Sequence, residues 1–283
     1  MSPLPLDVFN TGYTPVNGGP GWDATVPATW PACTTTLISG DTDAVLVDAL
    51  MTIKQGQELS AWIHAKGKNV SSVVITHGHG DHFFGAAQVL KSFPDAALVA
   101  VSTQVIDEAR EQTQPEVLQN WTAWFGDDYD HKPPIPTLMD GTTIDLEGHA
   151  IAVHPVGGAD GVLATVVHVA ELDTVCAGDA VYNDIHMWLW NSTPESRANW
   201  LATIDAIAAM QPATIIVGHR DPDAPDDDAR RILAQSRRYV EDFDRAMTRA
   251  SAAGDLIDTM MERYGNFGNP YTLFLAAHSQ FPQ

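Results

Sequence analysis

Short apolar runs alternate along the chain with segments in which apolar residues recur at helical spacing. Runs bounded by turn residues predict strands at 35–38, 44–47, 71–75, 96–101, 143–146, 150–154, 163–169, 174–177 and 213–217. The first two runs are joined by the turn-forming residues 39–42, which predicts a β-hairpin.

Segments of helical periodicity lie between and after these strands. They predict helices at 55–66, 86–90, 195–210, 226–250, 255–264 and 271–279, and one or two helices within 103–125. Helix 195–210 has the clearest boundaries, because Pro194 stands at its start and Pro212 closes it. Acidic residues 226–228 suit the positive end of the dipole of the long helix that follows them.

Strands and helices in both halves of the chain favour an α/β or α+β class with several layers. The 283 residues are long enough for one large domain, so we expect a single domain over 1–283. Residues 1–33 are expected to form an irregular lead-in, because Gly, Pro, Thr and Asn dominate from residue 8 onward. Residues 226–283 are expected to form C-terminal helices packed on the domain.

Charge and cysteine content narrow the partners and the compartment. The chain carries 36 acidic and 15 basic residues, a net charge of −21, and this disfavours nucleic acid and anionic membranes as partners. No apolar stretch approaches the ~20 residues of a membrane span. Cys33 and Cys176 make no disulfide framework, and the first ten residues do not resemble a signal peptide. We therefore expect a cytoplasmic protein; whether it forms a homo-oligomer stays open.

Candidate chemistry concentrates in residues 76–82, Thr-His-Gly-His-Gly-Asp-His, directly after the strand predicted at 71–75. Imidazole nitrogens and carboxylate oxygens are standard zinc ligands. Gly78 and Gly80 allow a tight loop that turns these side chains toward one point. The segment therefore predicts a metal site.

Residues 77–82 resemble the HxHxDH signature of the metallo-β-lactamase superfamily. Three other segments match that family in order and spacing: an early strand ending at Asp48, a later strand ending at Asp179, and a late strand followed by His219. The resemblance implies a four-layer αββα sandwich, with one or two metals at the edge where its two sheets meet.

The resemblance also assigns metal ligands. His77 and His79 would bind a first metal, whereas Asp81, His82 and His219 would bind a second. Asp179 would bridge the two. Such a pair lowers the pKa of a shared water and polarises a substrate carbonyl. A protonated Asp81 could assist the leaving group, which makes Asp81 a candidate catalytic residue as well.

One position departs from the family pattern. A Gly-His-Thr turn normally supplies a third histidine to the first metal, but Gly158 occupies that place here. Asp160 lies two residues further on and could replace the histidine, and His154 is a lesser candidate. Zinc is the expected metal. Manganese or iron becomes a possible alternative if a carboxylate replaces an imidazole among the ligands. Loss of the first metal is the other possibility.

The segment 182–190 follows Asp179 directly and could lie over the metals. His186 is the main candidate functional residue of this segment, for substrate binding or for proton donation, and Tyr182 and Trp188 are further candidates. The alternative is that its apolar residues only pack under a helix. Aromatic residues of the tail, 254–281, are expected to pack between helices, although they could wall one side of a pocket.

The resemblance implies a metal-dependent hydrolase that cleaves a carbonyl bond of a small molecule: an ester, lactone, thioester or amide. A β-lactamase is disfavoured, because those enzymes usually carry Cys where Asp179 stands and are exported. A phosphodiesterase, a di-iron oxidoreductase and a non-catalytic relative remain as alternatives. The oxidoreductases usually have Glu where His79 stands, together with a flavin domain.

Overall fold

The computed structural model describes residues 4–281 and contains two mixed β-sheets. In the first sheet the order is β1-β4-β5-β6-β7-β8: Leu6–Asn10, Thr34–Ser39, Asp43–Val47, Asn69–Val74, Ala97–Ala100 and Thr137–Leu138. In the second sheet the order is β13-β12-β11-β10-β9: Thr214–Val217, Thr174–Gly178, Ala164–Val169, His149–Gly157 and Thr143–Leu146.

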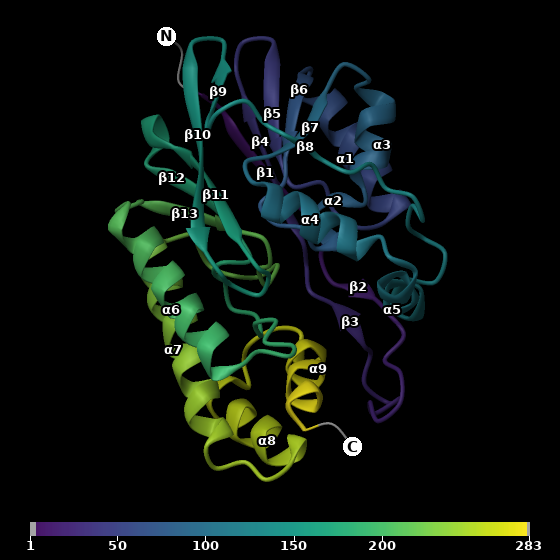
Figure 1. Cartoon of the computed structure of the whole chain (residues 1–283), viewed down its shortest axis with the longest axis vertical. Coiled ribbons are helices and arrows are strands. Elements are labelled where there is room, and N and C mark those ends of the chain that lie inside the picture. Colours follow the sequence, from purple (N-terminus) through teal and green to yellow (C-terminus); the bar gives the residue numbers. More distant parts are fainter. Residues whose placement is uncertain (1–3, 282–283) are drawn as a thin grey trace.

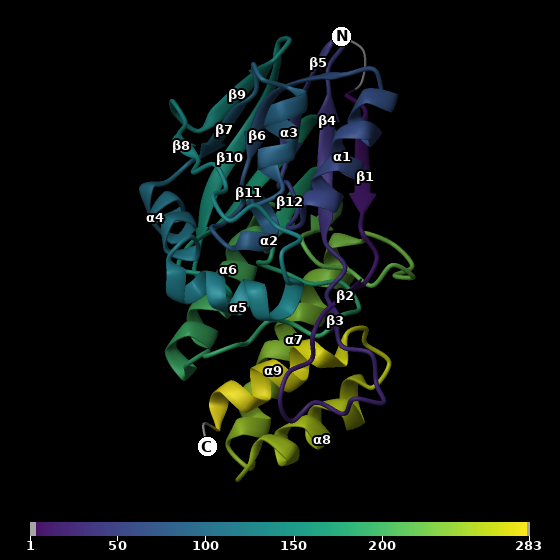
Figure 2. The same cartoon turned by 90° about the vertical axis from the view of Figure 1, so that its right-hand side faces the viewer.

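Helices cover the outer face of each sheet (Figures 1 and 2). The first sheet is covered by α1 (Ile53–Ala65), α3 (Ala86–Ser92), α4 (Thr103–Gln112) and α5 (Pro115–Phe125), and the short α2 (Gly80–Phe83) precedes α3. The second sheet is covered by α6 (Pro194–Ala209) and α7 (Ala229–Met247), while α8 (Ala253–Tyr264) packs next to α7 and α9 (Pro270–Gln280) packs next to α8, beyond the end of the sheets. The predicted αββα sandwich is therefore confirmed.

Alternation of side chains along buried strands builds these layers. In β5, Ala44 and Leu46 pack against the helices of the first sheet, whereas Val45 and Val47 pack between the two sheets. In β13, Ile216 lies between the sheets and its neighbours face the helices. These strands are apolar on both faces, which explains why they appear in the sequence as continuous apolar runs.

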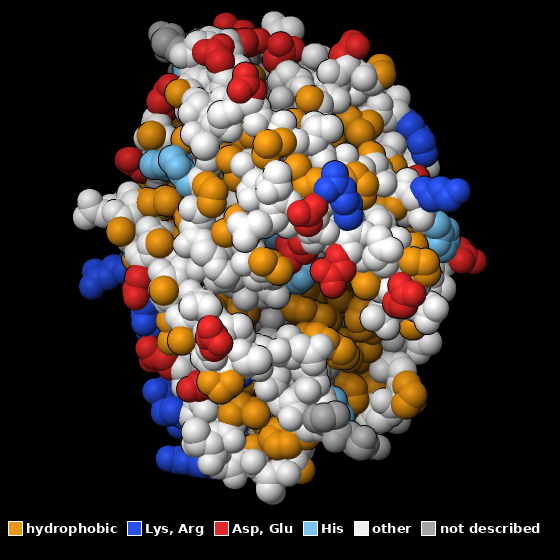
Figure 3. All heavy atoms as spheres, in the orientation of Figure 1, with side chains coloured by type: hydrophobic (Ala, Val, Ile, Leu, Met, Phe, Trp, Pro, Cys, Tyr) orange, Lys and Arg blue, Asp and Glu red, His pale blue; other side chains and the backbone are white. Residues whose placement is uncertain are grey.

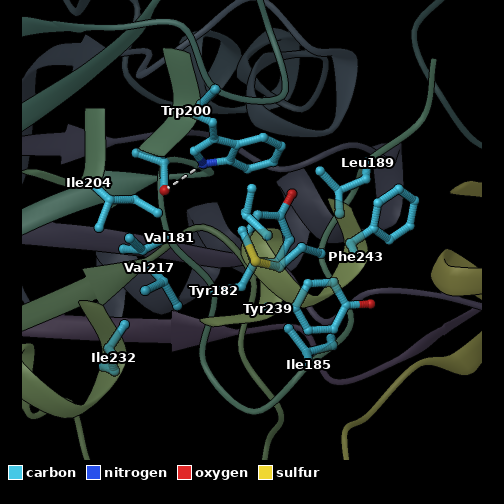
Figure 4. Packing of buried hydrophobic residues seen from close by; sticks show 14 of the residues in the cluster. Val181, Tyr182, Ile185, Leu189, Trp200, Ile204, Val217, Ile232, Tyr239 and Phe243 are labelled. Carbon is cyan, nitrogen blue, oxygen red and sulfur yellow. Dashed lines mark hydrogen bonds between the residues drawn. The ribbon is translucent and has the colours of Figure 1, made fainter. Parts of the chain in front are cut away.

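The C-terminal helices form the core on the outer face of the second sheet. Figure 4 shows Trp200 of α6 beside Tyr239 and Phe243 of α7, all buried. The indole of Trp200 donates a hydrogen bond to the carbonyl oxygen of Ala180, 2.8 Å away. Helix α7 begins at Ala229 and not at 226, because Asp228 is its N-cap and accepts a hydrogen bond from the amide of Arg231.

The prediction that the lead-in is irregular throughout was wrong. Strand β1 pairs antiparallel with β4 and forms an edge of the first sheet. Two short strands, β2 (Thr14–Pro15) and β3 (Thr29–Trp30), pair with each other.

The segment 103–125, which was expected to hold one or two helices, holds two. They are separated at Gln114, because a residue that precedes proline disfavours helical geometry. Within residues 4–281, every helix is too short or too polar to span a bilayer.

Candidate metal centre

The candidate ligands lie where the two sheets meet, at the carboxyl ends of their parallel strands. The β6 strand leads into the loop 76–79 and helix α2, while β12 leads to Asp179 and β13 to His219. Asp160 comes from the Gly-rich turn between β10 and β11. A hydrogen bond from the Thr165 amide to the Thr76 carbonyl, 2.9 Å long, ties the two sheets together at this edge.

Four of the predicted ligands form one buried group. Asp179 lies between two imidazoles, with Oδ1 3.3 Å from His82 Nε2 and Oδ2 3.1 Å from His219 Nε2. Asp81 Oδ2 is 3.2 Å from His219 Nε2 and 3.9 Å from His82 Nε2. The structure thus brings together the residues that the resemblance assigned to a second metal and a bridge.

The other predicted ligands form a second group beside the first. Asp160 Oδ2 is 3.1 Å from His79 Nδ1 and 3.7 Å from His77 Nε2. The rings of His77 and His82 lie 4.1 Å apart, so the two groups adjoin. Asp160 therefore stands where a carboxylate could fill the place that Gly158 leaves empty.

The buried polar atoms of these groups test whether a metal fits. Four of them have no hydrogen-bond partner among residues 4–281: His77 Nε2, His82 Nε2, Asp160 Oδ2 and Asp179 Oδ1. Leaving such atoms unpaired in a protein interior is costly. Two sets of three residues each bring their ligand atoms to within 4.8 Å of one another. One set is His77, His82 and Asp179, and the other is His77, His79 and Asp160. This donor set fits one or two zinc ions.

Neighbouring side chains orient the candidate ligands. Asp48 Oδ2 lies 2.9 Å from His82 Nδ1 and accepts a hydrogen bond from the hydroxyl of Thr76. Trp30 Nε1 donates to Asp81 Oδ2 over 2.8 Å, and the hydroxyl of Tyr182 donates to Asp179 Oδ2 over 2.6 Å. Outer partners of this kind fix ligand orientation in metal sites.

Two glycines allow the close approach on which the cluster depends. A Cβ at Gly218 would lie 2.2 Å from Asp179 Oδ1 and 2.8 Å from His82 Cε1. A Cβ at Gly78 would lie 2.5 Å from the backbone nitrogen of Ala109. Any larger residue at either position would push the strands or helix α4 away from the ligands.

Burial and opposite charges shift the pKa values of the cluster. Burial lowers the pKa of His79, but Asp160 and Glu108 outweigh burial and raise it to about 9. Burial would raise the pKa of Asp179, yet His219 and His82 hold it well below its usual value. Burial also raises the pKa of Asp160 to about 6. Without a cation, protons on His79, His82 and His219 balance the carboxylates, so binding of a cation would release protons.

An aromatic pocket of about 150 Å³ opens onto these ligands. Polar and ligand side chains line it together with five tryptophans: Trp30, Trp121, Trp124, Trp188 and Trp190. Trp30 is at their centre, with ring centroids 5.0 Å from Trp124 and 5.3 Å from both Trp121 and Trp188. Because its indole also holds Asp81, Trp30 connects the pocket wall to the metal centre.

Two sequence-based candidates lie elsewhere. His186 is fully buried, with Nδ1 2.8 Å from the hydroxyl of Tyr239 and its ring 5.9 Å from that of Phe267. It packs in the helical core and does not line the pocket, so the geometry gives no support to the expected contact with substrate, whereas Trp188 of the same segment does line the pocket. His154 lies half-buried on β10, outside both ligand groups.

Glu108 and Trp30 are functional candidates that the sequence did not reveal. Glu108 lies on α4 with Oε1 4.0 Å from His79 Nε2. Cys33 also reaches the centre, since its sulfur lies 4.0 Å from Asp81 Oδ2. Their distance in sequence from residues 76–82 left no local signal that could have found them.

Comparisons with known proteins bear on the fold and the family of the chain. The chain is 17% identical to a metallo-beta-lactamase family protein from Thermus thermophilus, with a TM-score of 0.66 over 96% of this chain and 92% of that one. It is 16% identical to a beta-lactamase domain protein from Burkholderia ambifaria (TM-score 0.62; 88% and 81%) and to FIM-1 from Pseudomonas aeruginosa in its mono-zinc form (0.57; 85% and 96%). Curated protein sequences give no match. The sequence model of the metallo-beta-lactamase superfamily matches residues 28–219, and the protein therefore belongs to that superfamily.

Proposed function

We propose that this protein is a metal-dependent hydrolase that cleaves a carbonyl bond, in an ester, lactone, thioester or amide, of a small molecule. The observation that carries the proposal is the set of four unpaired, buried ligand atoms, two of which belong to Asp160 and Asp179, residues that line the aromatic pocket. A divalent cation held there would supply Lewis acidity, which lowers the pKa of water and polarises a carbonyl.

The residues of the chain have distinct roles in this proposal. His77, His79 and Asp160 hold one cation, and Asp81, His82 and His219 hold another, with Asp179 between them. Asp81 acts as a ligand and not as a proton donor. Burial would raise its pKa, but His82 and His219 keep that pKa below its usual value, so the carboxylate stays ionised at neutral pH.

The tryptophans around the centre bind the substrate and exclude water. Trp30 and Trp188 present apolar rings beside Asp81 and His79, where the reacting group would lie. A drier site strengthens every electrostatic interaction within it. The pocket lining thus supports hydrolysis of a carbonyl that is flanked by apolar groups.

Metal analysis and a substrate panel test the proposal. Purified protein is expected to hold one to two zinc ions per chain. It should hydrolyse at least one 4-nitrophenyl ester, lactone, thioester or amide, lose that activity on chelation, and regain it with zinc. Asp179→Asn is expected to lower the rate at least 100-fold, whereas the exposed Asp95→Asn leaves it unchanged. Full activity without metal, cleavage of bis(4-nitrophenyl) phosphate alone, or iron with no hydrolysis would contradict the proposal.

Asp160→Ala tests the first cation site separately. Removing the carboxylate beside His77 and His79 is expected to lower metal occupancy by about one ion per chain, because two imidazoles and the shared Asp179 carboxylate leave that site short of a ligand. Inductively coupled plasma mass spectrometry of the dialysed variant measures the change. Unchanged occupancy would mean that Asp160 is not a ligand.

A further inference from the structure

A second and larger cavity adjoins the aromatic pocket over the metal centre. Its volume is about 580 Å³. Asn120, Trp124 and Trp190 line both spaces, so the two cavities share a wall formed by α5 and the segment that precedes α6. Trp190 is one of the few large apolar side chains left exposed within residues 4–281. The hollow visible in Figure 3 is lined by hydrophobic side chains.

Three segments far apart in sequence are fixed to one another around this second cavity. Trp124 Nε1 of α5 donates a hydrogen bond to the hydroxyl oxygen of Tyr271 in α9, 3.2 Å away. That hydroxyl in turn donates to the carbonyl oxygen of Gly18 over 3.1 Å. The ring of Trp22 packs against Tyr271 and Phe274, with centroids 5.0 and 5.1 Å away. The walls are thus built and held in place, not formed by one loose loop.

The charge of the lining selects against anionic ligands. No Lys or Arg lines either cavity among residues 4–281. In the described part of the chain, His278 is the one basic side chain of the second cavity, and its Nδ1 already contacts the carbonyl oxygen of Phe274 at 2.9 Å. A carboxylate or phosphate there would lose its hydration without gaining a cationic partner. An uncharged apolar group would lose only its contact with water.

We propose that the second cavity binds the non-reacting part of the substrate, an uncharged alkyl or aryl group, while the carbonyl lies at the metal centre. This inference rests on the proposed function, which places the reacting bond beside His79 and Asp179. Because Trp124 and Trp190 border both spaces, one elongated molecule that lies against these two side chains would reach from one cavity into the other. The substrate class is therefore an ester, lactone or thioester with a long or aromatic neutral substituent.

Binding of neutral 1-alkanols to the zinc-loaded protein tests the cavity without requiring turnover. From butanol to decanol, the dissociation constant is expected to fall by up to about four-fold for each methylene, the effect of burying one CH₂ group. Tryptophan emission and calorimetry both report binding. An ω-hydroxyalkanesulfonate of the same length carries an anionic group that is a poor zinc ligand, and it should bind at least ten-fold more weakly than the alkanol. Affinity that does not change with chain length, or tighter binding of the sulfonate, would overturn the inference.

Ala123→Phe tests the place of binding. Ala123 lines only the second cavity and is exposed on α5, so a phenyl ring there would fill the space while leaving the metal centre intact. The variant should bind decanol at least ten-fold more weakly and raise KM for a decanoate ester, with kcat for an acetate ester unchanged. Ala61→Phe, at an exposed position of α1 outside both cavities, is the matched control. The inference would be overturned if decanol binding were weakened equally in both variants, or if it were weakened in neither.

These measurements separate the two proposals. If decanol binds in a length-dependent manner that Ala123→Phe blocks, but no carbonyl substrate is cleaved, the cavity stands and the hydrolase proposal fails. If hydrolysis is found with no dependence on chain length or on Ala123, the hydrolase proposal stands and the cavity inference fails.

Discussion

Glu108 is a single buried carboxylate that joins the loop carrying His77 and His79 to the turn carrying Asp160. Its Oε2 accepts a hydrogen bond from the Gly78 amide over 2.8 Å, and its Oε1 accepts one from the Val162 amide over 2.9 Å. Gly78 separates His77 from His79, while Val162 follows Asp160 by two residues. Glu108 therefore holds the His-Gly-His loop at a fixed position relative to the Gly-rich turn.

Glu108→Gln is expected to weaken metal binding at the first site about 10- to 100-fold, the usual effect of losing an outer partner. The amide of Gln can accept from one backbone N–H, but its NH₂ group then faces the other. Zinc titration against a chromophoric chelator, fitted to two sites, measures the change. Glu111→Gln, exposed on the same helix, should match the wild type. An equal loss at both sites, or none, would contradict a positioning role for Glu108.

Residue by residue, the sequence predicted the site where ligands are local or follow a strand. The His-Gly-His-Gly-Asp-His segment is a signal in itself, and Asp160 could be named because it stands two residues from Gly158. The direction of the His186 ring could not be predicted, because the position of this residue after Asp179 in the sequence does not determine it. Glu108 gave no signal, because a polar residue on an amphipathic helix normally faces solvent.

At the scale of elements, strands with a local apolar run could be predicted wherever they lie in a sheet, whereas the edge strand β1 could not. Strand β5 lies inside the first sheet and β13 lies at an edge of the second beside helix α7, and both are apolar on their two faces. Every residue of β1 is only partly buried, and its pairing with β4 depends on contacts about 24 to 32 residues away in sequence. No local pattern contains that information.

The contact of α9 with α5 and the lead-in depends on the hydroxyl of Tyr271. Tyr271→Phe would leave the indole N–H of Trp124 and the Gly18 carbonyl without this partner. The free energy of unfolding is expected to fall by about 1–2 kcal/mol. Thermal unfolding should show a Tm lower by roughly 2–8 °C. Tyr264→Phe removes a hydroxyl that bonds to Asp242 elsewhere, and it serves as a comparison for effects on the second cavity.

If the hydroxyl of Tyr271 fixes the cavity wall, only Tyr271→Phe should also weaken decanol binding. A Tyr271→Phe variant with wild-type stability and wild-type decanol binding would show that packing of the rings alone fixes α9.

At the scale of the whole molecule, His82 and His219 on the one hand and His186 on the other are buried histidines with opposite pKa shifts. His82 and His219 face carboxylates in the metal centre, and their pKa values are raised well above normal although burial opposes this. The pKa of His77 in the same centre is lowered by burial and by the neighbouring imidazoles. His186, in the helical core, has no carboxylate partner, and burial lowers its pKa to about 3. His82 and His219 should therefore change stability with pH in the direction opposite to that of His186, and His186 can be tested without touching the metal centre.

Stability is expected to fall in mild acid because of His186. Below pH ~6.5 the unfolded chain binds a proton at this histidine, whereas the folded chain stays neutral there until pH falls to about 3. One such proton lowers the free energy of unfolding by about 1.4 kcal/mol per pH unit. His186→Gln, which does not titrate, should reduce the slope by that amount between pH 6 and 4 in urea unfolding at fixed zinc concentration. The exposed His131→Gln should keep the wild-type slope. If His186→Gln also keeps the wild-type slope, then His186 is protonated in the folded core, and its burial does not contribute to the acid sensitivity of the protein.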